Sequence, residues 1–140
     1  MDVLKVDGES IADEFCALEQ NWKDFDFFYL HVKKTDTDGE SGDFSGKVRV
    51  IEEVDALLPR LLALQPDVVI VSGDHSSPAL LKSHSWHPVP VLLYARHVRP
   101  DGIAEFGERA CTRGSLGTLP AKHMIHFALA NAGRILKYGA

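Results

Sequence analysis

The stretch Val-Val-Ile-Val-Ser-Gly-Asp-His-Ser-Ser-Pro, residues 68–78, decides the fold class. Its apolar, mostly β-branched start predicts a buried strand over residues 67–72. Gly73 then allows the backbone to turn, and Asp74 and His75 follow at once. A strand that carries adjacent aspartate and histidine side chains at its C-terminal end is typical of metal sites in α/β proteins.

Outward from this stretch, strands and helices alternate along the chain. The hydrophobic spacing predicts helices over residues 10–21, 47–64 and 122–136, and further strands over residues 25–32 and 89–95. Polar loops are expected at residues 33–45 and 73–87. This order predicts an α/β fold with a mostly parallel sheet flanked by helices, in a single domain over residues 1–140. Both loops would follow carboxyl ends of strands, where functional groups gather.

The composition is that of an ordinary globular protein. The 140 residues are 45% hydrophobic and 25% charged, with a formal net charge of −5. This charge offers no electrostatic footprint for nucleic acid, so no nucleic-acid partner is expected. No apolar run approaches the roughly 20 residues that span a bilayer, and no signal-peptide pattern opens the chain. Cys16 and Cys111 are the only cysteines and lie far apart in the chain, so we expect reduced thiols. Because the sequence has neither a membrane-spanning run nor a signal peptide, we expect no membrane partner and a cytoplasmic location.

Two groups of residues carry metal-ligand chemistry. In the first polar loop, Asp36 and Glu40 flank a glycine closely enough to aim both carboxylates at one point. In the second, Asp74 and His75 are adjacent and His84 follows. Carboxylates suit Mg²⁺ or Mn²⁺, and imidazole suits Mn²⁺ or Zn²⁺. On the residues alone, a metal site and a solvated acidic loop both stay open.

Several motifs resemble the cofactor-independent (2,3-bisphosphoglycerate-independent) phosphoglycerate mutases of the archaeal type, in the alkaline phosphatase superfamily. These motifs, in chain order, are the run from His31 to Asp36 with Gly39, Gly42 and Asp43, then Gly73-Asp-His-Ser, His84 with Pro88-Val-Pro90, Gly114-Ser-Leu-Gly117, and Lys137-Tyr-Gly-Ala140. The similarity covers nearly the whole chain. It implies an alkaline-phosphatase-like fold, of which this chain is a partial domain.

The resemblance implies two divalent metal ions, Mn²⁺ or Mg²⁺, with Zn²⁺ as a further option. Asp36 and His84 match ligands of one ion, and Asp74 and His75 match ligands of the other. Glu40 stands where the family usually has a third, histidine ligand for the first ion, which would shift the preference towards harder ions. Lys33 or Lys34 would stabilise phosphate charge, although strand alternation would place them on opposite faces.

For the full-length protein, the resemblance implies an isomerase of glycolysis and gluconeogenesis that interconverts 3- and 2-phosphoglycerate through a phosphoserine. The family's nucleophilic serine, a further aspartate ligand and the inserted substrate-binding domain have no match here. We therefore expect a C-terminal portion of the phosphatase-like domain, inactive alone, whose partner is the missing N-terminal half of the same protein. The alternatives are a non-catalytic alkaline-phosphatase-like module and a related phosphatase or phosphonate-processing metalloenzyme.

Overall fold

The computed structural model describes residues 2–135, which divide into two compact units. The first unit comprises Met1–Pro66 and Ser77–His84, and the second comprises Asp67–Ser76 and Ser85–Ala140. Within the second unit, Ser76 and Ser85 pair as an isolated antiparallel bridge, in which the Ser85 N–H donates to the Ser76 carbonyl at 2.8 Å. The chain thus leaves this unit and re-enters it at adjacent points. The assignment of residues 1–140 to a single domain stays a prediction.

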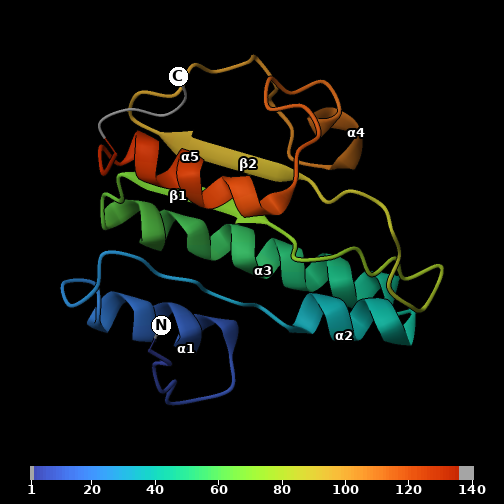
Figure 1. Ribbon diagram of the computed structural model, residues 1–140. Coiled ribbons are helices and arrows are strands. Elements are labelled where there is room, and N and C mark those ends of the chain that lie inside the picture. Colours follow the sequence, from blue (N-terminus) through green and yellow to red (C-terminus); the bar gives the residue numbers. More distant parts are fainter. Residues whose placement is uncertain (1, 136–140) are drawn as a thin grey trace. The chain divides into compact units, whose positions relative to one another are not determined.

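Three helices build the first unit: α1 (Ile11–Gln20), α2 (Lys34–Ser41) and α3 (Phe44–Ala63) (Figure 1). The predicted helices over residues 10–21 and 47–64 are confirmed as α1 and α3. Helix α1 begins with a capping box, because Ser10 and Asp13 each bond the other's backbone N–H. Helix α3 starts earlier than predicted, since the Asp43 carboxylate accepts from the Gly46 N–H at 2.8 Å and caps it.

The core of the first unit lies between α1 and α3. Phe15, with only 1% of its surface exposed, packs with Ile11 and Val50. Partly buried side chains surround this cluster: Leu30, Val32, Val54, Leu57 and Leu61. The apolar stripes of two amphipathic helices therefore meet, as their sequence spacing predicts.

The predicted strand over residues 25–32 is wrong. This segment runs between α1 and α3 without strand hydrogen bonding (Figure 1). Its side chains still alternate, with Phe28, Leu30 and Val32 half-buried and Phe27 and Tyr29 exposed. The residues thus have the period of a strand, but a strand also needs a neighbouring backbone to pair with. Among the described residues, the two paired strands β1 and β2 belong to the second unit.

The predicted polar loop over residues 33–45 is also wrong, because most of it forms α2. Its sequence, Lys-Thr-Asp-Thr-Asp-Gly-Glu-Ser, has no apolar stripe and contains a glycine, so its periodicity favours a loop. The helix ends at Gly42, which has the left-handed φ of +82° that favours glycine. Packing against α3, and the hydrogen bond from Ser77 to Asp36, supply the stability that the local sequence lacks.

The second unit contains the strands β1 (Val68–Ser72) and β2 (Val91–Ala95), which confirm the predicted strands over residues 67–72 and 89–95. The prediction of a parallel sheet is wrong: the two strands are antiparallel, with Val68 opposite Ala95 and Ser72 opposite Val91. Parallel pairing needs a crossover, usually a helix. The connection over residues 73–90 contains only turns and the isolated bridge, so the chain returns antiparallel.

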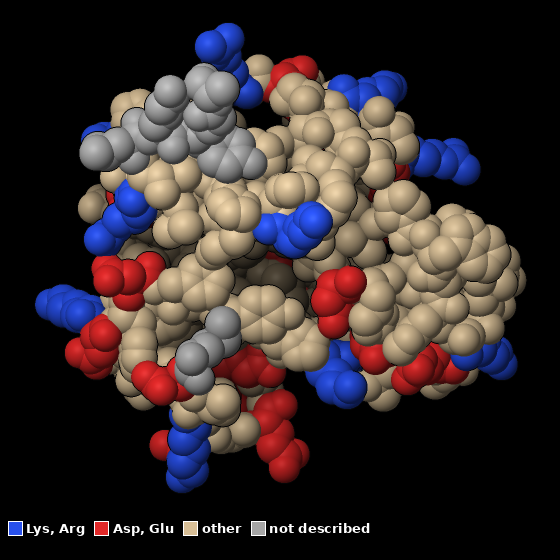
Figure 2. Space-filling view, viewed as in Figure 1, with Lys and Arg blue, Asp and Glu red and all other residues tan. Residues whose placement is uncertain are grey.

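The remaining elements are short. They are α4 (Glu108–Cys111), the 3₁₀ helix η1 (Ala121–His123) and α5 (Met124–Asn131), which packs on β1. The helix predicted over residues 122–136 is confirmed in its central part, while its last residue and the motif at residues 137–140 lie outside the described residues. Within residues 2–135, no helix has the length and apolar character needed to cross a membrane. Figure 2 shows Lys and Arg interspersed with Asp and Glu on the visible face.

Truncation of the most buried aromatic side chain tests the core. We expect Phe15→Ala to lower the free energy of unfolding by about 3–5 kcal/mol, because it removes a buried ring and leaves a cavity. Phe44→Ala is the matched control, since 70% of Phe44 is exposed, and should change stability by less than about 0.5 kcal/mol. Urea unfolding measures both, and equal effects would contradict this core.

A second test uses the ion pair between α1 and α3. Arg60 donates to both carboxylate oxygens of Glu19, at 2.8 and 2.7 Å, and this lowers the pKa of Glu19. A lowered acid pKa stabilises the fold above the ordinary value of about 4.3, and the gain is lost as pH falls through the lowered pKa. We therefore expect Glu19→Gln to lower the melting temperature at pH 7, and to lower it less at pH 3, where more of the Glu19 carboxyl is protonated. The exposed Glu52→Gln should have little effect at either pH; a pH-independent effect of Glu19→Gln would contradict the linkage.

Candidate metal centre

Two carboxylates and one imidazole converge in the first unit. Asp36 and Glu40 lie one turn apart on α2, so their side chains share a face of the helix. His84 comes from the segment Ser77–His84, and its Nε2 lies 3.3 Å from Asp36 Oδ1 and 3.3 Å from Glu40 Oε1. Three of the predicted ligands are therefore brought together. The spacing expected from a curled loop arises instead from a helical turn.

The surroundings of these three side chains differ. Asp36 is largely buried, with 17% of its side chain exposed, whereas Glu40 and His84 are each 52% exposed. Asp36 is thus shielded from solvent, while the side chains of Glu40 and His84 are accessible to it. Two hard oxygen donors with one imidazole match the donor sets that bind Mn²⁺ or Mg²⁺, so these residues fit a divalent cation.

The segment carrying His84 is anchored on α2 through Ser77, which is 4% exposed. The Ser77 hydroxyl donates to Asp36 Oδ1 at 2.5 Å, and the Ser77 carbonyl accepts from Lys47 Nζ of α3 at 2.6 Å. A Cβ on Gly39 would lie 2.3 Å from this carbonyl oxygen, which is too close for any side chain. Gly39 therefore permits the segment to approach the helix.

The other predicted ligands, Asp74 and His75, lie in the second unit directly after β1. The Asp74 carboxylate accepts from the His75 backbone N–H at 3.0 Å, and its other oxygen lies 3.6 Å from His75 Nε2. About half of the Asp74 side chain is exposed. The end of the strand thus presents a carboxylate and an imidazole together, as the sequence predicts.

Lys33 and Lys34 stand at the start of α2, as its N-cap and first residue, and both are exposed. The premise that strand alternation separates them is wrong, because the segment is not a strand. Lys34 borders a hollow of about 340 Å³ whose lining carries charges of both signs: Lys34, Asp38, Asp43, Gly46, Arg49, Val50 and Glu53. A phosphate-binding role for either lysine stays a prediction.

Sequence reasoning missed Ser77, which bonds Asp36, and Gly39 and Lys47, which contact Ser77. Ser77 and Gly39 lie inside the motifs Gly-Asp-His-Ser-Ser-Pro and Asp-Thr-Asp-Gly-Glu, and Lys47 has the place of an ordinary polar residue in an amphipathic helix. A serine two residues after the Asp74–His75 pair is only a weak sequence signal for a residue that contacts the site. No signal in the sequence relates Lys47 to a carbonyl thirty positions away along the chain.

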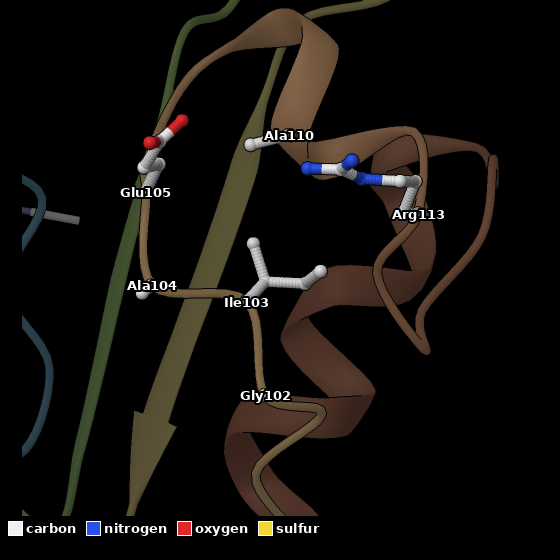
Figure 3. Close-up of a pocket in the computed structure, with 6 residues that line it drawn as sticks. All are labelled: Gly102, Ile103, Ala104, Glu105, Ala110 and Arg113. Atoms are coloured by element: carbon white, nitrogen blue, oxygen red, sulfur yellow. The ribbon is translucent and has the colours of Figure 1, made fainter.

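A second hollow, of about 230 Å³, lies in the second unit and is lined by residues 102–105 with Ala110 and Arg113. Figure 3 shows Glu105 and Arg113 on opposite sides of it. The neighbouring Asp101 accepts from the N–H groups of Ser115 and Ile103, at 2.8 and 3.1 Å, which lowers its pKa. This contact ties the Gly114-Ser-Leu-Gly117 motif to residues 101–103. No predicted site residue lines the hollow.

Comparisons with known proteins find relatives along the whole chain. The chain is 56% identical to a probable 2,3-bisphosphoglycerate-independent phosphoglycerate mutase of Thermus thermophilus and 51% identical to one of Thermotoga neapolitana. All of this chain is covered, but it spans only 35% of the length of each relative. The structure of the PH0037 protein from Pyrococcus horikoshii is also similar, with a TM-score of 0.87 and 30% identity over 94% of this chain and 41% of that one.

The family model that matches is described as the metalloenzyme superfamily, and the match covers residues 5–131. It includes both groups of predicted ligands. Since the match spans most of the chain, and an α/β arrangement presents carboxylate and imidazole groups together, the chain belongs to the metalloenzyme superfamily.

Proposed function

We propose that this chain is part of a 2,3-bisphosphoglycerate-independent phosphoglycerate mutase, an isomerase that interconverts 3- and 2-phosphoglycerate in glycolysis and gluconeogenesis. The observation that carries the proposal is the identity of 50% or more to probable mutases over the whole chain. Because the chain spans 35% of their length, the remaining parts of the active site would lie in other segments. These parts are the nucleophilic serine, a further aspartate ligand and the substrate-binding domain. The proposed location is the cytoplasm.

Two divalent ions, Mn²⁺ or Mg²⁺, are the proposed cofactors. Asp36, Glu40 and His84 would hold the first, supported by the 3.3 Å approaches of His84 Nε2 to both carboxylates. Asp74 and His75 would hold the second. Two carboxylates and one imidazole make the first site harder than a histidine-rich site would be, so Zn²⁺ is the less favoured ion there.

When bound, such ions supply positive charge that offsets the charge of a transferring phosphoryl group. The chain's own residues would hold the first ligand set. Asp36 is largely buried and accepts a hydrogen bond from Ser77, while Glu40 and His84 are half exposed and would meet the ion from the solvent side. Lys33 or Lys34, both exposed at the start of α2, would attract the phosphate of phosphoglycerate.

Calorimetric titration with Mn²⁺ tests the first site. We expect Asp36→Asn to weaken binding at least about tenfold, since loss even of an outer partner costs about 10–100-fold in metal affinity. Asp38→Asn is the control on the same helix, because Asp38 lines the separate hollow with Lys34. It should leave the Mn²⁺ affinity within about twofold of the parent. Equal losses in the two variants would refute the assignment of Asp36.

Turnover tests the function. With Mn²⁺ present, the 140-residue chain alone should not interconvert 3- and 2-phosphoglycerate, because the proposal places the nucleophilic serine in another segment of the full-length protein. The full-length gene product should do so. Within it, Asp74→Asn should reduce kcat at least about a hundredfold, since a catalytic metal contributes several kcal/mol. A full-length product that binds Mn²⁺ but lacks mutase activity would favour a non-catalytic module or a related phosphatase.

A further inference from the structure

We propose that Ser77 and Lys47 are positioning residues, which hold Asp36 in place for the first divalent cation. This inference rests on the proposed function, because it takes Asp36, Glu40 and His84 as the ligands. It adds a chain of contacts that reaches from α3 through residues 77–84 to α2. All the groups concerned belong to the first unit.

The first contact in this chain is the hydroxyl of Ser77. It donates to Asp36 Oδ1, the same oxygen that lies 3.3 Å from His84 Nε2. A carboxylate can rotate about its last torsion angle, and a donor on one oxygen restricts that rotation. Because Ser77 is buried, its hydrogen bond to the Asp36 carboxylate is shielded from water, which makes it stronger than an exposed one.

The second contact holds Ser77 itself. Lys47 Nζ donates to the Ser77 carbonyl oxygen at 2.6 Å, a short, charge-assisted bond between α3 and the segment Ser77–His84. Lys47 lies one turn after the α3 N-cap, where Asp43 holds the Gly46 N–H and the helix is well defined. The ammonium group thus ties the backbone of Ser77 to a rigid element.

Gly39 makes room for the backbone of this segment, and the flexible Lys82 side chain lies over Gly42. Gly39 lies under the Ser77 carbonyl, as described above. Gly42 lies under Lys82, whose Cε would be 2.5 Å from a Cβ at that position. Lys82 itself has a left-handed φ of +51°, which is uncommon for a residue with a side chain. The segment therefore contacts Gly39 of α2 through Ser77 and the C-cap Gly42 through the Lys82 side chain, and His84 follows two residues after Lys82.

Lys47 is positively charged, so a positioning role and a direct electrostatic effect on the cation can be told apart by experiment. A positive charge near a cation site repels the cation, so its removal alone would tighten binding. If Lys47 acts by holding Ser77, its removal instead weakens binding. The two roles therefore predict opposite changes in the Mn²⁺ dissociation constant.

The experiment is Mn²⁺ titration by calorimetry on the 140-residue chain, with the metal-free melting temperature recorded for every variant. We expect Ser77→Ala to raise the dissociation constant about tenfold and Ser77→Thr, which keeps a hydroxyl, to restore most of the affinity. Ser45→Ala is the matched control, because Ser45 is exposed at the start of α3. It should not change the affinity.

Lys47→Met is the second variant, and it keeps the test informative if Ser77→Ala fails to fold. It should also weaken Mn²⁺ binding several-fold, towards the tenfold loss typical of an outer partner. Arg49→Met removes the same charge from the same helix, where Arg49 makes an exposed ion pair with Asp43 at 3.7 Å. It should leave binding unchanged or slightly tighter.

The outcomes show separately whether the positioning role fails and whether the proposed metal site fails. Parent affinity in Ser77→Ala, or unchanged or tighter binding in Lys47→Met, would overturn the positioning role while Asp36→Asn still reports the site. Equal loss in Ser77→Ala and Ser77→Thr would also overturn it, because the hydroxyl would then be irrelevant. If neither the parent chain nor the full-length gene product binds Mn²⁺, both the proposed site and the positioning role fail.

Discussion

The close approach of the Ser77 backbone to α2 at Gly39 is the constraint on which the candidate centre depends. Only a residue without a Cβ leaves room for the Ser77 carbonyl at this point of the helix. The approach lets the Ser77 hydroxyl reach Asp36 and brings His84 opposite both carboxylates of α2. Lys47 completes it by bonding the same carbonyl from α3. Without this packing, the side chains of Asp36, Glu40 and His84 would lie on two polar segments that do not contact each other.

The sequence of α2 has a low helix propensity, and its tertiary contacts account for its helical structure. A helical turn is what places Asp36 and Glu40 on one face, and the last turn ends at a left-handed glycine. Among the residues that weaken the helix is Gly39, which makes room for the Ser77 carbonyl. Tertiary contacts with α3 and residues 77–84 supply the stability that the local sequence lacks.

The two sets of proposed ligands, one in each unit, are brought together in different ways. In the first unit, residues distant in the chain converge, and a buried serine and a lysine hold one of them. In the second unit, Asp74 and His75 are neighbours that follow the end of β1, so strand geometry alone presents them. The match to the metalloenzyme superfamily, over residues 5–131, spans both sets of positions. The relatives are about three times as long, which agrees with an active site completed by other segments.

The amino-acid sequence by itself determined the amphipathic helices α1 and α3, the strands β1 and β2, and the Asp74–His75 pair. Each depends on local periodicity or on residues adjacent in the chain. The tertiary structure alone decided that residues 25–32 stay unpaired, that residues 34–41 form a helix, and that β1 and β2 run antiparallel. It also decided the contacts of Ser77 and Lys47 around Asp36. Strand pairing, helix formation by a polar segment and convergence of distant side chains all depend on what lies beside a segment in space, and local sequence carries little of that information.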